Sequence, residues 1–144
     1  MMKPSLLIVD DNEPLLRLLK SIFDKRYTVF TASDGVEAIH LLTRGIRPRL
    51  ILCDLQMQNI DGYELVSHLS TSRLYRDIPV ILLTDVKRIT EVPPTAAVVK
   101  IVHKPFDPVF LSDTVNAVLE GHHAPAAHAG ALFTSGSFFT TSKS

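Results

Sequence analysis

Short apolar runs alternate with amphipathic segments along the first 120 residues, and this alternation most constrains the fold. The runs are residues 6–9, 28–32, 50–53, 80–83 and 98–102, of which the second is the weakest. They are rich in β-branched side chains and too short for helices. Uninterrupted apolar runs of this length are typical of parallel strands that are covered on both faces. The pattern therefore predicts five buried parallel strands.

Apolar side chains between these runs recur at helical spacing. The first segment follows the i, i+3, i+4, i+7 pattern at Leu15, Leu18, Leu19 and Ile22. The same spacing occurs within residues 36–42, 65–69 and 111–119. A further helix, at about residues 86–92, is expected to be short or distorted because prolines 93 and 94 interrupt it. Strands that alternate with helices predict a doubly wound α/β domain with right-handed crossovers.

Composition limits the classes of function. The chain has 144 residues, of which 46% are hydrophobic, enough for one domain with a real core. Lys+Arg and Asp+Glu are both 15, so a net charge of +0 offers no bulk attraction to nucleic acid or membrane. No secretory pattern or membrane span is present, so we expect a cytoplasmic protein. We expect one domain over residues 1–120 and a disordered tail over 121–144.

Polar residues follow four of the predicted strands at the point where each strand ends. They are Asp10 and Asp11, Asp54, Thr84 and Lys104. In an open α/β sheet the carboxyl ends of the strands lie on one edge, and ligands bind there. If these four strands are neighbours, the five side chains converge on one crevice.

Each of these residues also has a plainer interpretation. Asp11 or Asn12 could cap the helix that begins at Glu13. Thr84 and Asp54 could be loop residues, and a lone lysine is usually a solvated surface residue. Capping and loop formation do not require all of these residues to fall at strand ends on one edge, so we favour a shared site.

Three carboxylates held together repel one another and raise one another's pKa. Mg²⁺ relieves this repulsion, because it takes oxygen ligands and commonly shares its shell with a phosphate. Asp54 is then a candidate nucleophile, since carboxylates form aspartyl-phosphate intermediates. Thr84 offers a hydroxyl donor and Lys104 a compact positive charge to a phosphoryl group.

Four stretches of the chain resemble the receiver domains of two-component response regulators. In order, they are LIVDDNE at 7–13, CDLQMQNIDGYEL at 53–65, VILLT at 80–84 and HKPF at 103–106. The resemblance covers roughly residues 4–120 and is to a stand-alone, chemotaxis-regulator-like receiver. It implies a flavodoxin-like fold, with a five-stranded parallel sheet of strand order 2-1-3-4-5 and helices on both faces.

The resemblance also implies roles for the acidic residues. Asp54 would accept a phosphoryl group from the phosphohistidine of a histidine kinase or phosphotransfer protein. Asp11 and Asp54 would bind Mg²⁺ directly, Gln56 would bind it through its backbone carbonyl, and Asp10 would act through water.

The remaining implied roles concern the response to phosphorylation. Thr84 and Lys104 would contact the phosphoryl group, and the bond between Lys104 and Pro105 would be cis. Two switch positions depart from the family: Ile101 stands where an aromatic residue is usual, and Asp85 where a small residue is usual. The phosphoacceptor set is therefore complete, while the conformational response is expected to be atypical.

The function predicted from these residues is a phosphoacceptor that signals through protein contacts and is not a turnover enzyme. We expect the output partner at the surface of the helix near 86–92, the fifth strand and the helix over 111–119. Neither nucleic acid nor membrane is expected as a partner. The sequence leaves open whether the chain forms a homodimer.

Three alternative functions compete with this one. The first is a binding module that no longer uses phosphorylation. The second is a Mg²⁺-dependent phosphohydrolase, which would need an acid/base group where Gln56 lies. The third is a flavin protein, which would need a phosphate-binding loop rich in small residues after the first strand.

Overall fold

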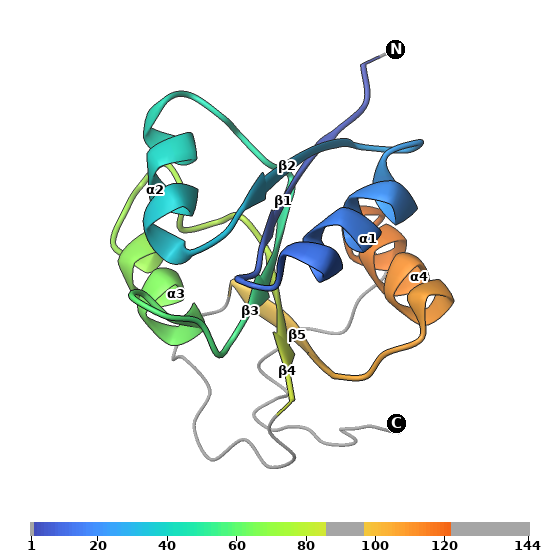
Figure 1. Cartoon of the computed structure of the whole chain (residues 1–144). Helices are drawn as coiled ribbons and strands as arrows, with labels where there is room; N and C mark the ends of the chain where they lie inside the picture. The colour runs from blue at the N-terminus through green and yellow to red at the C-terminus, as the bar shows by residue number, and fades with distance from the viewer. Residues whose placement is uncertain (1, 86–96, 122–144) are drawn as a thin grey trace.

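A five-stranded parallel sheet lies between two pairs of helices (Figure 1). The computed structural model describes residues 2–85 and 97–121. Its elements are β1 Ser5–Val9, α1 Glu13–Phe23, β2 Thr28–Ala32, α2 Gly35–Thr43, β3 Leu50–Asp54, α3 Gly62–Ser70, β4 Val80–Thr84, β5 Val98–His103 and α4 Pro108–Leu119. The helix expected near 86–92 and the tail expected after 121 lie outside the described residues.

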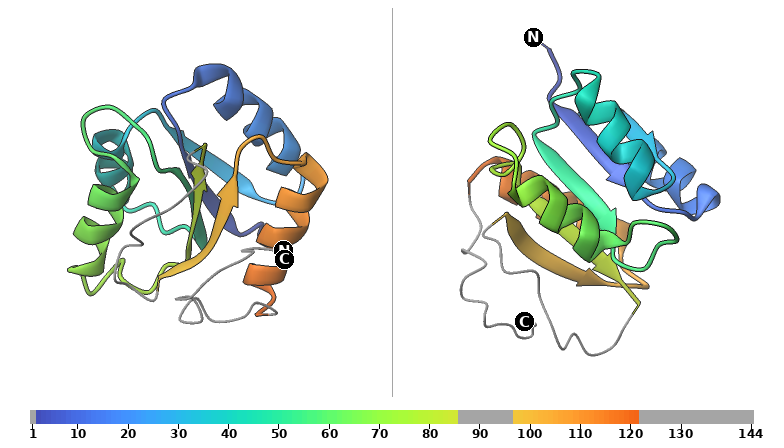
Figure 2. Two further views of the ribbon diagram at one scale, coloured as in Figure 1. Left: turned by 90° about the horizontal axis from the view of Figure 1, so that it is seen from below. Right: turned by 90° about the vertical axis from the view of Figure 1, so that its left-hand side faces the viewer.

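The strand order is β2-β1-β3-β4-β5, with every neighbouring pair parallel, which confirms the predicted sheet. Helices α1 and α4 cover one face, and α2 and α3 cover the other, as the two views of Figure 2 show. None of the helices in the described ranges has the length and apolar character that a membrane crossing requires.

The solid apolar runs are explained by burial on both faces of the sheet. In β1, Leu6 and Ile8 pack in the core beneath α1 and α4, whereas Leu7 and Val9 pack in the core beneath α2 and α3. All four side chains are completely buried. A strand with only one covered face would carry polar residues at alternate positions, so the absence of alternation in these runs correctly indicated two covered faces.

Strand β5 contains one irregularity. Its register against β4 shifts by one residue, because Val80 pairs with Val98 but Ile81 pairs with Lys100. The extra residue reverses the alternation, so Ile101 packs toward α2 and α3 while Val102 packs toward α1 and α4. The bulge therefore decides which face of the sheet receives the residue at the atypical switch position.

Each helix begins at an Asp or Asn side chain that accepts a backbone hydrogen bond. The four capping residues are Asn12, Asp34, Asp61 and Asp107. Asp61 forms a full capping box with Glu64 at the start of α3. In α1 the cap is Asn12, whose side chain accepts from the backbone N–H of Leu15 at 3.0 Å. Asp11 is thereby left available to the edge of the sheet.

The first residue of α3, Gly62, lies against the chain that carries Asp54. A Cβ atom at this position would stand 2.8 Å from the Asp54 carbonyl oxygen and 2.8 Å from Leu55 Cα. Both atoms belong to the backbone and cannot rotate away. Glycine at this position therefore lets the helix approach closely behind the candidate site.

We predict that Gly62→Ala lowers the free energy of unfolding by about 1–3 kcal/mol, because overpacking forces the backbone apart. Alanine forms helices better than glycine does, so a lower free energy of unfolding would report the close contact with the backbone of Asp54 and Leu55. Urea unfolding measures the change. Ser67→Ala, an exposed substitution on the same helix, is the control and should stay within about 0.5 kcal/mol of wild type. Equal stability of Gly62→Ala and wild type would contradict the close approach.

Candidate functional site: an acidic cluster at the carboxyl edge of the sheet

Backbone hydrogen bonds continue the sheet beyond the ends of its strands and position the candidate residues. Asp10 donates its N–H to Ala32 at 3.1 Å, Leu55 donates to Leu83 at 2.7 Å, and Lys104 donates to Thr84 at 2.7 Å. These bonds fix the main chain on both sides of the crevice. The residues at the strand ends are therefore held by the sheet and do not depend on free loops.

Three carboxylates meet at this edge. One oxygen from each of Asp10, Asp11 and Asp54 lies within 4.8 Å of the others. Asp10 is fully buried and Asp54 is only 3% exposed, whereas Asp11 is exposed. The cluster thus has a buried floor and one carboxylate at its open side.

Lys104 bridges the two buried carboxylates. Its Nζ lies 3.3 Å from Asp10 Oδ2 and 3.3 Å from Asp54 Oδ1. The other oxygen of Asp10 accepts the backbone N–H of Asn12 at 2.9 Å, and Asp54 Oδ1 also accepts that of Gln56 at 3.3 Å. The cluster therefore contains three carboxylates and the single ammonium group of Lys104, which leaves it with an excess of negative charge.

This excess appears in the pKa values. Burial, followed by the negative charge of Asp10, raises the pKa of Asp54 to about 6, although Lys104 and the backbone N–H of Gln56 oppose the rise. Burial lowers the pKa of Lys104, but Asp10 and Asp54 outweigh that effect, so its pKa is raised overall. Lys104 therefore stays charged, while the charge on Asp54 is unfavourable until a second cation or a proton arrives.

The donor set fits Mg²⁺. Mg²⁺ prefers oxygen ligands and retains several of its waters. The cluster offers three carboxylate oxygens whose charge Lys104 only partly balances, and the exposed Asp11 leaves room for water. The only thiol of the sequence, Cys53, is buried in the core beneath α2 and α3. Burial raises the pKa of this thiol well above its usual range, so Cys53 offers no thiolate ligand.

Thr84 is completely buried at the end of β4, and the side chain of Gln56 lies against its hydroxyl. Gln56 Nε2 is 2.9 Å from Thr84 Oγ1. Asp85 is exposed, and its backbone N–H donates to Gln56 Oε1 at 3.4 Å. Ile101 is half-buried against the core beneath α2 and α3. The Lys104–Pro105 peptide bond is cis, the isomer that the family resemblance implies.

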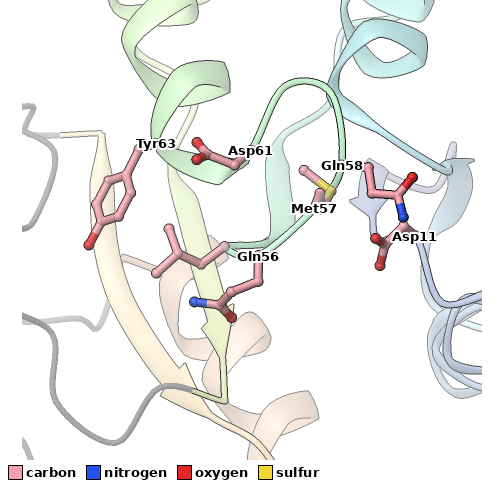
Figure 3. A pocket seen from close by; sticks show the side chains of 7 residues that line it. Asp11, Gln56, Met57, Gln58, Asp61 and Tyr63 are labelled. Carbon is pink, nitrogen blue, oxygen red and sulfur yellow. The ribbon is translucent and has the colours of Figure 1, made fainter.

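An open cavity of about 450 Å³ lies beside the cluster (Figure 3). Asp11, Gln56, Met57, Gln58, Asp61 and Tyr63 line it together with Leu55. Asn59, within the same loop, adopts a left-handed conformation with φ 65°, which asparagine tolerates better than most residues. The cavity opens beside Asp11, the exposed carboxylate of the cluster.

The structure brings Asp10, Asp11, Asp54 and Lys104 together at one edge, and the carbonyl of Thr84 accepts the backbone N–H of Lys104 there. It also decides the capping question, because Asn12 rather than Asp11 caps α1. Sequence reasoning missed the side chain of Gln56, for which only a backbone role was expected. Its position two residues after Asp54 was visible, but no sequence pattern shows that the side chain crosses to β4.

Comparison with known proteins identifies the family of this chain. The model of the response regulator receiver domain family matches residues 6–116. A chemotaxis protein CheY homolog of Campylobacter jejuni is 32% identical over 118 residues, which cover 79% of this chain and 91% of that protein. Hybrid signal transduction histidine kinase D of Dictyostelium discoideum is 42% identical over 82 residues, 57% of this chain but 5% of that protein.

Among solved structures, the chemotaxis response regulator CheY4 of Vibrio cholerae superposes with a TM-score of 0.73 at 27% identity, covering 81% of this chain and 99% of that one. The fold and the acidic edge define a receiver-type α/β protein. The chain belongs to the response regulator receiver domain family. Its function is that of a phosphoacceptor in two-component signalling.

We predict that Asp54→Asn raises the free energy of unfolding by about 1–2 kcal/mol at pH 7.5 without divalent cations. The Asp54 pKa is higher in the folded protein than in the unfolded chain, so its ionisation costs stability above about pH 6 and costs nothing below about pH 4. The advantage of the variant should therefore shrink as the pH falls from 6 to 4. Urea unfolding across this range measures it.

The control for this prediction is Asp113→Asn, which removes an exposed carboxylate of α4 outside the cluster. It should change the free energy of unfolding by less than about 0.5 kcal/mol, both at pH 7.5 and at pH 4. A loss of stability in Asp54→Asn at pH 7.5 would contradict the unfavourable charge inferred for Asp54.

Proposed function

We propose that Asp54 is the phosphoacceptor and receives a phosphoryl group from the phosphohistidine of a histidine kinase or phosphotransfer protein. The observation that carries this proposal is the position of Asp54, which lies at the end of β3 in contact with the Lys104 cation and close to two further carboxylates. An attacking carboxylate must be ionised. The ionised form of Asp54 is unfavourable in this site, and a bound cation would stabilise it.

In the proposed transfer, an oxygen of Asp54 forms a bond to phosphorus as the bond from phosphorus to the histidine nitrogen breaks. The imidazole leaves with the electron pair and takes up a proton. The Lys104 ammonium lies where it can balance charge on the phosphoryl oxygens, and the Thr84 hydroxyl can donate a hydrogen bond to one of them. The product is an aspartyl phosphate that persists as a signal.

Asp11 and Asp54 would hold Mg²⁺ directly, the backbone carbonyl of Gln56 would complete the protein ligands, and Asp10 would act through water. When bound, the ion supplies charge neutralisation for the transferring group. The chain contributes the fixed carboxylates, which the sheet positions before the ion arrives.

The output in this proposal is a protein contact, so the chain is a signalling module and not a turnover enzyme. The proposed contact surface includes β5 and α4, and the segment near 86–92 that the sequence adds to it lies outside the described residues. Exposed apolar side chains at the start of α4, Val109 at 66% and Phe110 at 49%, support a protein partner there. A cytoplasmic location belongs to the proposal and fits the unpaired Cys53 thiol.

The decisive experiment is incubation with Mg²⁺ and acetyl phosphate, followed by measurement of intact mass. We expect one phosphoryl adduct on wild type and on Asp113→Asn, and no adduct on Asp54→Asn. Omission of Mg²⁺ should abolish the adduct on wild type. Absence of an adduct under all conditions would move the interpretation to a phosphorylation-independent binding module. Continuous release of phosphate from simple phosphomonoesters would favour a hydrolase.

We predict that Mg²⁺ binding releases protons at pH 6 but not at pH 8. With the pKa of Asp54 at about 6, roughly half of the molecules carry a proton on this carboxyl at pH 6, and the cation must displace it. Titration calorimetry in two buffers of different ionisation enthalpy counts the protons. Asp54→Asn should release none at either pH. Proton release from wild type that is equal at both pH values would contradict the role of Asp54 as a ligand.

A further inference from the structure

Arginines are concentrated at the end of the sheet where its strands begin, opposite the acidic cluster. The α2–β3 loop, residues 44–49, and the α3–β4 loop, residues 71–79, contain five arginines, no lysine and a single acidic residue. The arginines are Arg44, Arg47, Arg49, Arg73 and Arg76, and the acidic residue is Asp77. Because the whole chain has a net charge of +0, these two loops are positive and the remainder of the chain is negative on balance.

Side-chain contacts hold the two loops against each other. The guanidinium carbon of Arg47 lies 5.4 Å from the centre of the Tyr75 ring, a cation–π contact. The carbonyl of Leu42 accepts a hydrogen bond from the Tyr75 hydroxyl at 3.1 Å and another from Arg47 Nη1 at 3.0 Å. Figure 2 shows the two loops next to each other at the ends of α2 and α3. They therefore form one surface, residues 44–49 and 71–79, which we call the arginine surface.

Four of the five arginines have no ionic partner within the described part of the chain. Arg47 takes part in the contact between the loops, whereas the other four are exposed. Within residues 2–85 and 97–121, no carboxylate lies at ion-pair distance from any of the four. On α1, by contrast, Arg17 and Lys20 both pair with carboxylates of their own helix or its end. The guanidinium groups of the arginine surface are therefore accessible to an anion from outside this part of the chain.

Stabilisation of helix ends does not account for these arginines. Both α2 and α3 end at this side of the sheet, and a cation near a helix C-terminus is favourable, but the effect fades beyond the last turn. Arg44 is the C-cap of α2 and can benefit from it. Arg49 and Arg76 each follow the last helical residue by six positions, since α2 ends at Thr43 and α3 at Ser70. The helix dipole therefore gives no reason for a positive charge at either position.

The other side chains of the arginine surface favour a protein partner. Leu74 is 63% exposed among the charges and offers an apolar contact, and arginine is enriched at protein interfaces. Single-stranded nucleic acid is bound by stacking on aromatic rings, but the Tyr75 ring is covered by Arg47. One leucine buries too little apolar area to anchor the chain to a membrane. The complementary partner is therefore a protein segment with carboxylates and an apolar side chain.

We propose that the arginine surface is a docking site for an acidic segment of a protein partner, whose carboxylates pair with the four exposed arginines while an apolar side chain covers Leu74. A guanidinium group binds a carboxylate through two parallel hydrogen bonds, which gives the contact direction as well as charge. The surface lies at the opposite end of the strands from Asp54 (Figure 1), so a partner bound there leaves the acidic cluster accessible. Docking at this surface does not depend on the phosphoacceptor role of Asp54.

The test measures binding of a fluorescently labelled peptide, in which glutamates flank a central leucine, to the full chain by anisotropy at about 0.15 M salt. Arg73→Gln/Arg76→Gln neutralises one loop of the surface, and Arg44→Gln/Arg49→Gln neutralises the other. The matched control is Arg17→Gln/Lys20→Gln, which removes the same amount of charge from exposed positions on α1. Each variant is compared with wild type in thermal unfolding to verify that it is folded.

We expect each double arginine variant to bind the peptide roughly five- to thirtyfold more weakly than wild type, the effect of losing two ion pairs. The α1 control should stay within about twofold of wild type, because salt screens charges outside the contact. Arg73→Lys/Arg76→Lys keeps the charge without the planar guanidinium group and should still weaken binding roughly threefold. Asp54→Asn should bind as wild type does.

Several results would overturn the docking site. They are no binding of the peptide to wild type, an equal loss of affinity in the α1 control, which indicates attraction by total charge alone, or lysine variants that bind as wild type does. Tighter binding of an oligothymidine strand, a DNA duplex or anionic lipid vesicles than of the peptide would assign the surface to another class of partner. The peptide is measured on unphosphorylated protein, so a failure of Asp54 to accept a phosphoryl group would remove the proposed function and not this surface.

Discussion

The ion pairs of Lys104 with two buried carboxylates are the interaction on which the arrangement at this edge depends. Asp10 and Asp54 repel each other, and without the ammonium 3.3 Å from each their shared burial would favour protonation or separation. The cation offsets part of this repulsion but not all of it, as the raised pKa of Asp54 indicates. The remaining negative charge is the reason this edge suits a metal cation.

The sheet makes this costly arrangement possible. Its strands are buried on both faces, and backbone bonds from Asp10, Leu55 and Lys104 extend the pairing past the strand ends. The carboxylates therefore cannot relieve their repulsion by moving the main chain. Close contact of Gly62 with the backbone behind Asp54 restricts it further. Stability of the core is thus what holds the acidic residues close together despite their repulsion.

Much of this architecture was predictable because local patterns report burial directly. Solid apolar runs indicated strands with two covered faces, and strand-end residues indicated one functional edge. Other features were not predictable. The one-residue bulge that places Ile101 on the α2 and α3 side depends on pairing with β4, and the choice of Asn12 over Asp11 as a cap depends on backbone geometry at the start of α1.

The sequence by itself determined the class of fold and the chemical groups at the carboxyl edge, because hydrophobic spacing and residue type are properties of neighbouring positions in the chain. Only the tertiary structure decided which groups touch. The contact of Gln56 with Thr84 joins residues 28 positions apart, and that of Lys104 with Asp10 joins residues 94 apart. Such distances depend on strand order and register, which arise from packing of the whole domain.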